Sequence, residues 1–201
     1  MKLRFSSTSP FVRKVWVAAL ETGLAERIER VMVSPTNPED VKSSPSPLGK
    51  MPCLVTDDGM VLFDSPVIMD YFNSLLDDLS LIPAKGTARW TTLRRQALGD
   101  GMIGCTVNIF VERMRKPERQ SKGWMVHNKA AVDRAIHSLE AEIGDLADVI
   151  DAGTITLAVA LAFVDMHFPE DSWREEHLKL AAWSNEFNRR PSMTATIVEE
   201  M

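Results

Sequence analysis

Cysteine, tyrosine and long apolar runs are scarce in this sequence of 201 residues, and each scarcity excludes a class of protein. With two cysteines, a disulfide framework is not expected, and a reducing cytoplasmic setting is the default expectation. Tyrosine occurs once, at Tyr71, so any mechanism that needs a phenolic hydroxyl has a single candidate. No apolar run approaches the roughly 20 residues of a membrane-spanning helix.

The sequence also lacks an excess of positive charge and a pattern typical of a signal peptide at its start. The formal net charge is -5 at pH 7, whereas proteins that bind nucleic acids usually carry excess positive charge. The opening residues, MKLRFSSTSP, lack the apolar core of a signal peptide. The four histidines show no metal-ligand spacing. We therefore expect no nucleic-acid partner, no membrane partner and no metal cofactor.

Strand and helix patterns alternate over the first part of the chain. Helices are predicted from Pro10 and from Asp64 or Ser65, each followed by an apolar face. A proline-rich loop with at most one helical turn is expected over residues 34–49. The order β-α-β-loop-β-β-α indicates a small mixed sheet covered by helices. Strands are predicted, in chain order, at residues 2–5, 28–33, 52–56 and 60–63.

Beyond Pro83 the patterns are helical only, which indicates an all-helical bundle. An apolar stripe from Val132 to Ile150 predicts one helix, and residues 157–168, apolar on nearly all sides, predict a buried one. A last helical face ends before Pro191. We therefore predict an α/β domain over residues 1–78, a linker over residues 79–86 and an all-α domain over residues 87–201.

The first chemical signal is Ser9-Pro10-Phe11-Val12, which lies between the first strand and the first helix. In a thioredoxin-like fold this position carries the C-x-x-C redox motif, but serine and valine at its two ends cannot support thiol-disulfide exchange. A hydroxyl at a helix N-terminus can instead donate a hydrogen bond to a bound thiolate, assisted by the helix dipole. The alternative is that Ser9 only caps the helix, and the sequence leaves both interpretations open.

Two further segments carry a possible ligand chemistry. A cis Met51–Pro52 bond would turn the N–H and C=O of Met51 outward, where they can pair with a peptide ligand as an added strand. An ordinary trans proline is the alternative. Asp64-Ser65 opens a helix directly after a strand, so free N–H groups there can bind a carboxylate and Asp64 can pair with an ammonium group. Simple capping is the alternative.

Together these segments resemble the glutathione transferase superfamily, and the resemblance covers nearly the whole chain. Their positions, after the first strand, before the third and after the fourth, match that family. The run from Ser9 to Arg13 resembles the serine-type catalytic motif of bacterial and theta-like members, and the ending from Trp183 to Ser192 resembles the last helix. The resemblance implies a glutathione S-transferase fold, with a thioredoxin-like α/β N-terminal domain and an all-α C-terminal bundle.

The resemblance also implies a role for each matching residue. Ser9 would be the catalytic residue that holds the glutathione thiolate. Met51 would pair its backbone with the cysteinyl unit, and Pro52 would shape that backbone. Asp64 and Ser65 would bind the amine and carboxylate of the γ-glutamyl unit. The remaining glutathione-binding residues that it implies are Phe11 and Lys50, with Lys50 at the glycyl carboxylate.

The function that the resemblance implies is a glutathione transferase, with glutathione as co-substrate and a small hydrophobic electrophile as acceptor. The electrophile would lie against the region from Met102 to Arg113. A homodimer is implied, through the helix after Ser65 and the helix that starts near Thr87. The alternatives are a glutathione-dependent isomerase or dehalogenase, and a non-catalytic protein that binds glutathione or a partner.

The sequence departs from the family pattern in two places. The family has an acid three residues after a serine or threonine at the start of its central helix, but here Val159 follows Thr156. The reciprocal hydrogen bonds of a capping box are therefore expected to be missing, at a cost of about 1 kcal/mol. Asp64 is shorter than the glutamate that is commoner at its position.

Three other patterns predict structure only. Residues Gly99 to Gly104 spell G-x-G-x-x-G, but they follow a helical pattern, so close helix packing is expected and not a dinucleotide site. The basic run from Arg113 to Lys122 is expected to be solvated at a helix end. Cys53 is expected to be a small core residue and not a nucleophile.

Overall fold

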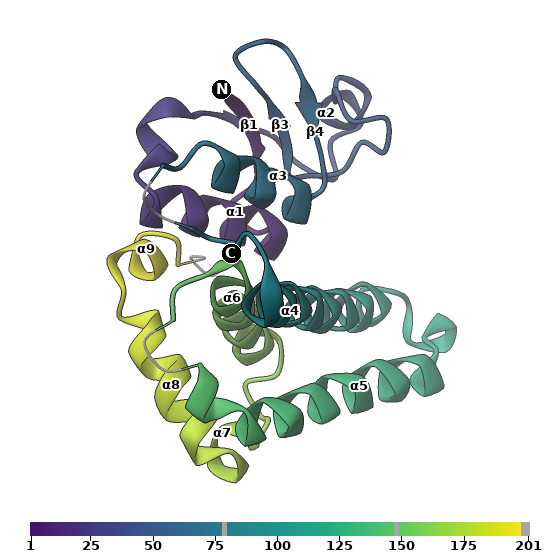
Figure 1. The fold of residues 1–201 in the computed structure, drawn as a ribbon. Coiled ribbons are helices and arrows are strands. Elements are labelled where there is room, and N and C mark those ends of the chain that lie inside the picture. The colour runs from purple at the N-terminus through teal and green to yellow at the C-terminus, as the bar shows by residue number, and fades with distance from the viewer. Residues whose placement is uncertain (78–79, 147–148, 198–201) are drawn as a thin grey trace. The chain divides into compact units, whose positions relative to one another are not determined.

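The structure, a computed structural model, describes residues 1–77, 80–146 and 149–197 (Figure 1). It forms two compact units: residues 1–92 together with the described residues from Pro191 onward, and residues Leu93–Arg190. Asp78 and Leu79, where the first domain and the linker were expected to meet, lie outside the described residues. The domain limits drawn from the sequence remain predictions.

The first unit contains a four-stranded sheet in the order β2-β1-β3-β4. Strand β1 is parallel to β2 and antiparallel to β3, and β3 is antiparallel to β4. All of these strands fall within the ranges predicted from alternation and β-branched residues, so the mixed sheet is confirmed. Their bounds are β1 (Lys2–Phe5), β2 (Glu29–Met32), β3 (Cys53–Val55) and β4 (Val61–Leu62).

Two amphipathic helices, α1 (Pro10–Glu21) and α3 (Ser65–Ser74), lie together against the sheet (Figure 1). Their apolar positions recur at helical spacing and are buried, which is why both segments are helical. The loop after β2 contains the one short helical turn that its prolines permit, α2 (Pro38–Lys42), and a 3-10 helix, η1 (Leu24–Arg27), follows α1. Gly23, with φ at 71°, ends α1 in the left-handed conformation expected of a glycine.

Residues far along the chain return to pack on α1. The short helix α9 (Pro191–Thr194) contacts α1. The Arg13 guanidinium donates to the hydroxyl of Thr196 at 3.3 Å and to the carbonyl of Met193 at 3.3 Å, and burial lowers the pKa of Arg13. At the other end of α1, the Ser192 hydroxyl donates to the Glu21 carboxylate. Both ends of α1 are therefore held by this returning segment.

The second unit is helical over the residues that the structure describes. Helix α4 begins in the first unit and continues into the second. Helix α6 forms the core, because every residue from Ala152 to Leu161 is buried. The predicted buried helix and the predicted all-helical half are thereby confirmed. The bounds are α4 (Gly86–Arg113), η2 (Pro117–Arg119), α5 (Lys122–Ala141), η3 (Ile143–Asp145), α6 (Ala152–His167), α7 (Trp173–Glu176) and α8 (Leu178–Asn188).

The expected loss of a capping box at the central helix is wrong. Helix α6 begins one turn earlier than Thr156, with Asp151 as its N-cap. The Thr154 amide donates to the Asp151 carboxylate at 2.8 Å, and the Asp151 amide donates to the Thr154 hydroxyl at 3.0 Å. The capping box is therefore complete, with the acid at the first position and the hydroxyl at the fourth, the reverse of the family order.

The prediction of one helix from Val132 to Ile150 is also wrong, because α5 ends at Ala141 and a 3-10 turn follows. The Glu142 carboxylate accepts hydrogen bonds from both terminal nitrogens of Arg94, at 2.9 and 2.5 Å. Arg95 donates to the carbonyl of Asp145 at 3.1 Å. These contacts with α4 hold the chain in a turn, although Leu146 remains buried as the apolar stripe requires.

Helices α4 and α6 pack closely at Gly99, as the G-x-G-x-x-G pattern predicted. A Cβ atom placed on Gly99 would lie 2.8 Å from Thr156 Cγ2 and 3.0 Å from the Thr156 carbonyl carbon, whereas one on Gly101 would have nothing within 4 Å. We predict that Gly99→Ala lowers the free energy of unfolding by about 1–3 kcal/mol through overpacking. Chemical denaturation measures this change.

The matched control is Gly101→Ala in the same helix. It should leave stability unchanged or raise it by up to about 1 kcal/mol, because alanine is the better helix former. A Gly99→Ala variant as stable as Gly101→Ala would show that α4 and α6 do not meet at this glycine.

The pairing of Glu142 with α4 predicts a pH-dependent contribution to stability. Hydrogen bonds and the charge of Arg94 lower the pKa of Glu142 below its usual 4.5 in the folded protein. The folded state therefore releases this proton more readily than the unfolded state, and the contribution is present above that usual value and lost as the pH falls through the depressed one. We expect Glu142→Gln to cost about 1 kcal/mol at neutral pH.

Thermal unfolding over an acid pH series tests this expectation, since the difference between Glu142→Gln and wild type should shrink as the pH falls. Glu186→Gln is the control, because its pair with Arg189 is about three-quarters exposed on both side chains and should change little. A difference that stays constant down the pH series would contradict the assignment.

Candidate functional site

The register of the sheet gathers three loops at one edge. Arg4 of β1 pairs with Cys53 of β3, and Leu54 of β3 pairs with Leu62 of β4. Because β3 runs antiparallel to both neighbours, the end of β1, the start of β3 and the end of β4 lie at the same edge. The segments that follow β1, precede β3 and follow β4 are the ones singled out in the sequence.

Ser9 is the N-cap of α1, and its side-chain oxygen accepts a hydrogen bond from the Val12 amide at 3.3 Å. Ser9 therefore caps the helix, as one of the two interpretations predicted. In the part of the chain that the structure describes, the Ser9 hydroxyl donates to no other group, so its proton is available to a ligand. The residue is half-buried, and α1 directs its positive end toward it.

The Met51–Pro52 bond is cis. Pro52 is buried ahead of β3, and Met51 is half-buried. Among the described residues, neither the amide nor the carbonyl of Met51 makes a hydrogen bond within the chain. A backbone donor and acceptor are therefore unpaired at the edge of the sheet, as a strand-like ligand requires.

Asp64 is the N-cap residue of α3, but its side chain makes no capping hydrogen bond. Within the described residues its carboxylate has no ion-pair or hydrogen-bond partner, so simple capping does not account for it. Ser65 is buried and begins α3, and the amides of Ser65 and Val67 in its first turn have no intrahelical acceptor, since Pro66 between them carries no N–H. An acid and a set of amide donors thus stand together at this helix start.

The other two candidate residues lie close in sequence to these groups. Phe11 is half-buried in the first turn of α1, and Lys50 is exposed just before the cis bond. The fold thus brings Ser9, Met51, Pro52, Asp64 and Ser65 to one edge of the sheet, with Phe11 and Lys50 adjacent in the chain.

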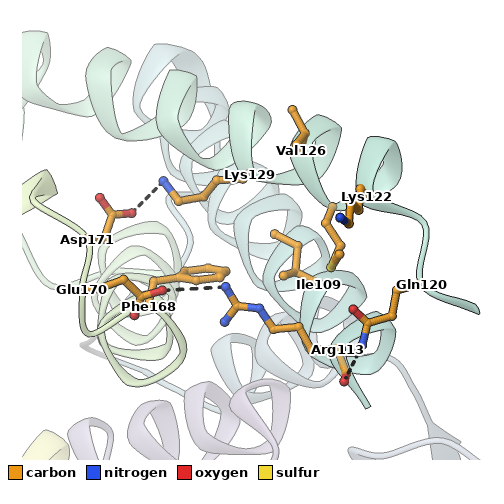
Figure 2. Close-up of a pocket in the computed structure, with 10 residues that line it drawn as sticks. Ile109, Arg113, Gln120, Lys122, Val126, Lys129, Phe168, Glu170 and Asp171 are labelled. Atoms are coloured by element: carbon orange, nitrogen blue, oxygen red, sulfur yellow. Dashed lines mark hydrogen bonds and ion pairs between the residues drawn. The ribbon is translucent and has the colours of Figure 1, made fainter. Parts of the chain in front are cut away.

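The structure also bears on Cys53 and on the basic run. Cys53 is fully buried, as expected, and burial raises the pKa of its thiol. The described residues contain no group of three or more side chains placed to hold a metal ion. The basic side chains of the run from Arg113 to Lys122 are exposed at the end of α4 and beyond it, as expected. The Arg113 guanidinium also lies over the Phe168 ring, 5.0 Å from its centre (Figure 2). No signal in the sequence pointed to that contact, which joins the last residue of α4 to the residue after α6.

Comparison with known proteins agrees with this fold. A model of the glutathione S-transferase N-terminal domain matches residues 8–75. A glutathione transferase family member from Pseudomonas fluorescens Pf-5, solved with bound glutathione, is 39% identical over 99% of each chain, with a TM-score of 0.94. A second structure from that organism, with bound S-(propanoic acid)-glutathione, is 38% identical over 100% of each chain, with a TM-score of 0.91.

A curated relative from Escherichia coli (strain K12), the uncharacterized GST-like protein YibF, is 29% identical over 176 residues, which are 86% of each chain. The sheet, the helical second half and these matches together define a thioredoxin-like N-terminal domain joined to a mostly helical region. The chain belongs to the glutathione S-transferase superfamily. None of its described helices is both long enough and apolar enough to cross a membrane.

Proposed function

We propose that this protein binds glutathione at the shared edge of β1, β3 and β4 and transfers the glutathione thiolate to a small hydrophobic electrophile. The observation that supports this function is that several polar groups at that edge have no hydrogen-bond partner among the described residues. The Ser9 hydroxyl proton, the Met51 backbone and the Asp64 carboxylate have no partner within the described chain. They suit the thiolate, the central peptide unit and the terminal amine of one tripeptide.

Ser9 is the catalytic residue in this proposal. A free thiol has a pKa of about 8.5, and lowering it by two units requires about 2.7 kcal/mol. One hydrogen bond to a charged group contributes about 1.5–3 kcal/mol, and the N-terminus of α1 contributes about 0.5 kcal/mol more. The two effects together are large enough to keep the bound sulfur ionised near neutral pH. Ser9 can accept from Val12 and donate to the sulfur at the same time.

The remaining contacts hold the rest of the tripeptide. Met51, oriented by Pro52, pairs its backbone with the cysteinyl unit, and Lys50 reaches the glycyl carboxylate. Asp64 pairs with the γ-glutamyl ammonium group, while the start of α3 at Ser65 donates to the γ-glutamyl carboxylate. Phe11 is the remaining glutathione-binding residue in this proposal.

Three further features are part of the same proposal. The electrophile lies against residues 102–113 of α4. The protein is a cytoplasmic homodimer, which buries the exposed apolar side chains of α3 and of the start of α4. Val67 and Trp90, which are 45% and 67% exposed, are the side chains on those two helices that such an interface would cover.

We predict that Ser9→Ala lowers turnover of an aryl halide about 10- to 100-fold at neutral pH and leaves the dissociation constant of glutathione within about threefold. The reason is that the lost hydrogen bond acts on the charged sulfur and not on the peptide. Ultraviolet titration of the bound thiolate should show a correspondingly higher thiol pKa in the variant.

Ser121→Ala is the matched control, because Ser121 caps α5 in the same way: its hydroxyl oxygen accepts a hydrogen bond from the Trp124 amide at 3.4 Å. It should cost similar stability, about 1 kcal/mol, with no loss of turnover. Equal turnover in Ser9→Ala and wild type would remove Ser9 from the mechanism. An unshifted thiol pKa in the wild-type complex would instead indicate a non-catalytic glutathione-binding protein.

A second prediction concerns Asp64. Asp64→Asn removes the charge that faces the ligand ammonium group, so it should weaken glutathione binding about tenfold in calorimetric titrations. Asp70→Asn, an exposed carboxylate two turns along the same helix, should bind as wild type does. N-acetylglutathione has no ammonium group, so wild type and Asp64→Asn should bind it equally. A tenfold difference that persists with the acetylated ligand would contradict the pairing.

A further inference from the structure

Two histidines that are far apart in the chain meet in the second unit. His137 lies on α5, and His177 lies between α7 and α8, forty positions later. Their ring centres are 5.9 Å apart and their ring planes make an angle of 81°. Helices α5 and α8 contact each other (Figure 1). Both histidines belong to Leu93–Arg190, so the pair is complete without the first unit.

The ring of His177 is held in one orientation. The carbonyl of Trp173 accepts a hydrogen bond from the His177 amide at 3.0 Å and lies 3.1 Å from ring Nδ1. A carbonyl oxygen can only accept, so Nδ1 carries the proton and Nε2 of the neutral ring keeps its lone pair. Trp173 is only 3% exposed, and its indole N–H donates to Asp165 at 2.9 Å. Metal-binding histidines have this arrangement, with one ring nitrogen donating to a carbonyl and the other free for the ion.

The remaining ring nitrogens have no competing partner. Within the described chain, His137 makes no hydrogen bond or ion pair, and Nε2 of His177 makes none. His137 is exposed and His177 is half-buried, so the pair is open to ions from solvent. Water can therefore complete the coordination of an ion that the two rings share.

A carboxylate adjusts the charge at this point of the fold. The N-terminus of α8, which follows His177 directly, carries the positive end of the helix dipole and would repel a cation. Glu140 lies one turn along α5 from His137. Its carboxylate accepts the amides of Lys179 at 3.3 Å and Leu180 at 2.7 Å, both in the first turn of α8. The negative charge of Glu140 therefore offsets the helix dipole where a cation would bind.

We propose that His137 and His177 together bind one divalent transition-metal ion, such as Zn²⁺ or Cu²⁺, through their free ring nitrogens. Because a zinc–nitrogen bond is about 2.0–2.1 Å long, two imidazoles that share one ion have ring centres up to about 6.5 Å apart. The observed 5.9 Å falls within that limit. Imidazole suits Zn²⁺, Cu²⁺ and Ni²⁺, whereas Mg²⁺ requires oxygen ligands. The bound ion would link α5 to the start of α8.

The test is calorimetric titration of Zn²⁺ into the untagged full chain at pH 7.5, with Mg²⁺ as the comparison. We expect one Zn²⁺ per chain, with a dissociation constant between about 1 and 100 μM. Mg²⁺ should show no binding up to about 1 mM. Saturating Zn²⁺ should raise the midpoint of thermal unfolding by about 3–5 °C, because the ion binds the folded state and not the separated histidines.

Single variants locate the site. His137→Gln and His177→Gln should each weaken Zn²⁺ binding at least tenfold and remove most of the thermal shift. The matched control is His127→Gln, which removes another exposed histidine of α5, one that stacks on Trp124 with ring centres 5.7 Å apart. It should bind Zn²⁺ within twofold of wild type. His137 makes no hydrogen bond among the described residues, so its variant tests the site even where His177→Gln lowers stability.

Cu²⁺ supplies an independent spectroscopic test, because it is the divalent ion that imidazole sites bind most tightly. Electron paramagnetic resonance of the complex with one equivalent of Cu²⁺ should show coupling to two imidazole nitrogens in wild type and in His127→Gln. Each of the two site variants should show coupling to one at most.

Zn²⁺ binding that both site variants lose and His127→Gln keeps would support the proposal. Three results would overturn it: no Zn²⁺ binding below about 1 mM, binding that His137→Gln leaves within twofold of wild type, or one ion for every two chains. The last result would place the ion between copies of the chain and not between the two helices. None of these outcomes depends on glutathione binding or on the role of Ser9.

Discussion

Hydrogen bonding along both sides of β1 is the constraint on which the rest of the first unit depends. The parallel partner β2 and the antiparallel partner β3 hold β1 in the middle of the sheet. With Arg4 opposite Cys53, the chain leaves β1 where it enters β3. A shift of one residue in this pairing would turn Leu3 and Phe5 away from the core and separate Ser9 from Met51. Burial of those two side chains therefore specifies the position of the site as well as the fold.

Local patterns predicted the elements well where the deciding forces are local. Alternation predicted the strands, and helical spacing after Pro10 predicted the start of α1. The failures came where distant residues decide the outcome. The end of α5 is set by Arg94 and Arg95, which lie more than forty positions earlier in the chain. The family pattern predicts the cap of α6 near Thr156, whereas Asp151, one turn earlier, supplies it.

The candidate site was predictable in part because each of its segments is short and follows a recognisable strand. The sequence alone left open whether Ser9 caps the helix or binds a thiolate. The two roles are compatible, since the hydroxyl oxygen accepts from the Val12 amide while its proton stays available. The contact between Arg113 and Phe168 was not predictable, because its two residues lie far apart in the chain and leave no shared periodic pattern in the sequence.

The segment from Pro191 to Thr196 forms hydrogen bonds with both ends of α1, although it is synthesised about 180 residues later. During synthesis on a ribosome, the sheet and α1 emerge long before their last packing partners exist. The partly buried guanidinium of Arg13 then lacks the carbonyl and hydroxyl oxygens to which it donates in the folded protein. The first unit therefore reaches its final stability only after the whole helical half has emerged, so a nascent chain stalled within α6 would display α1 in an incompletely packed form.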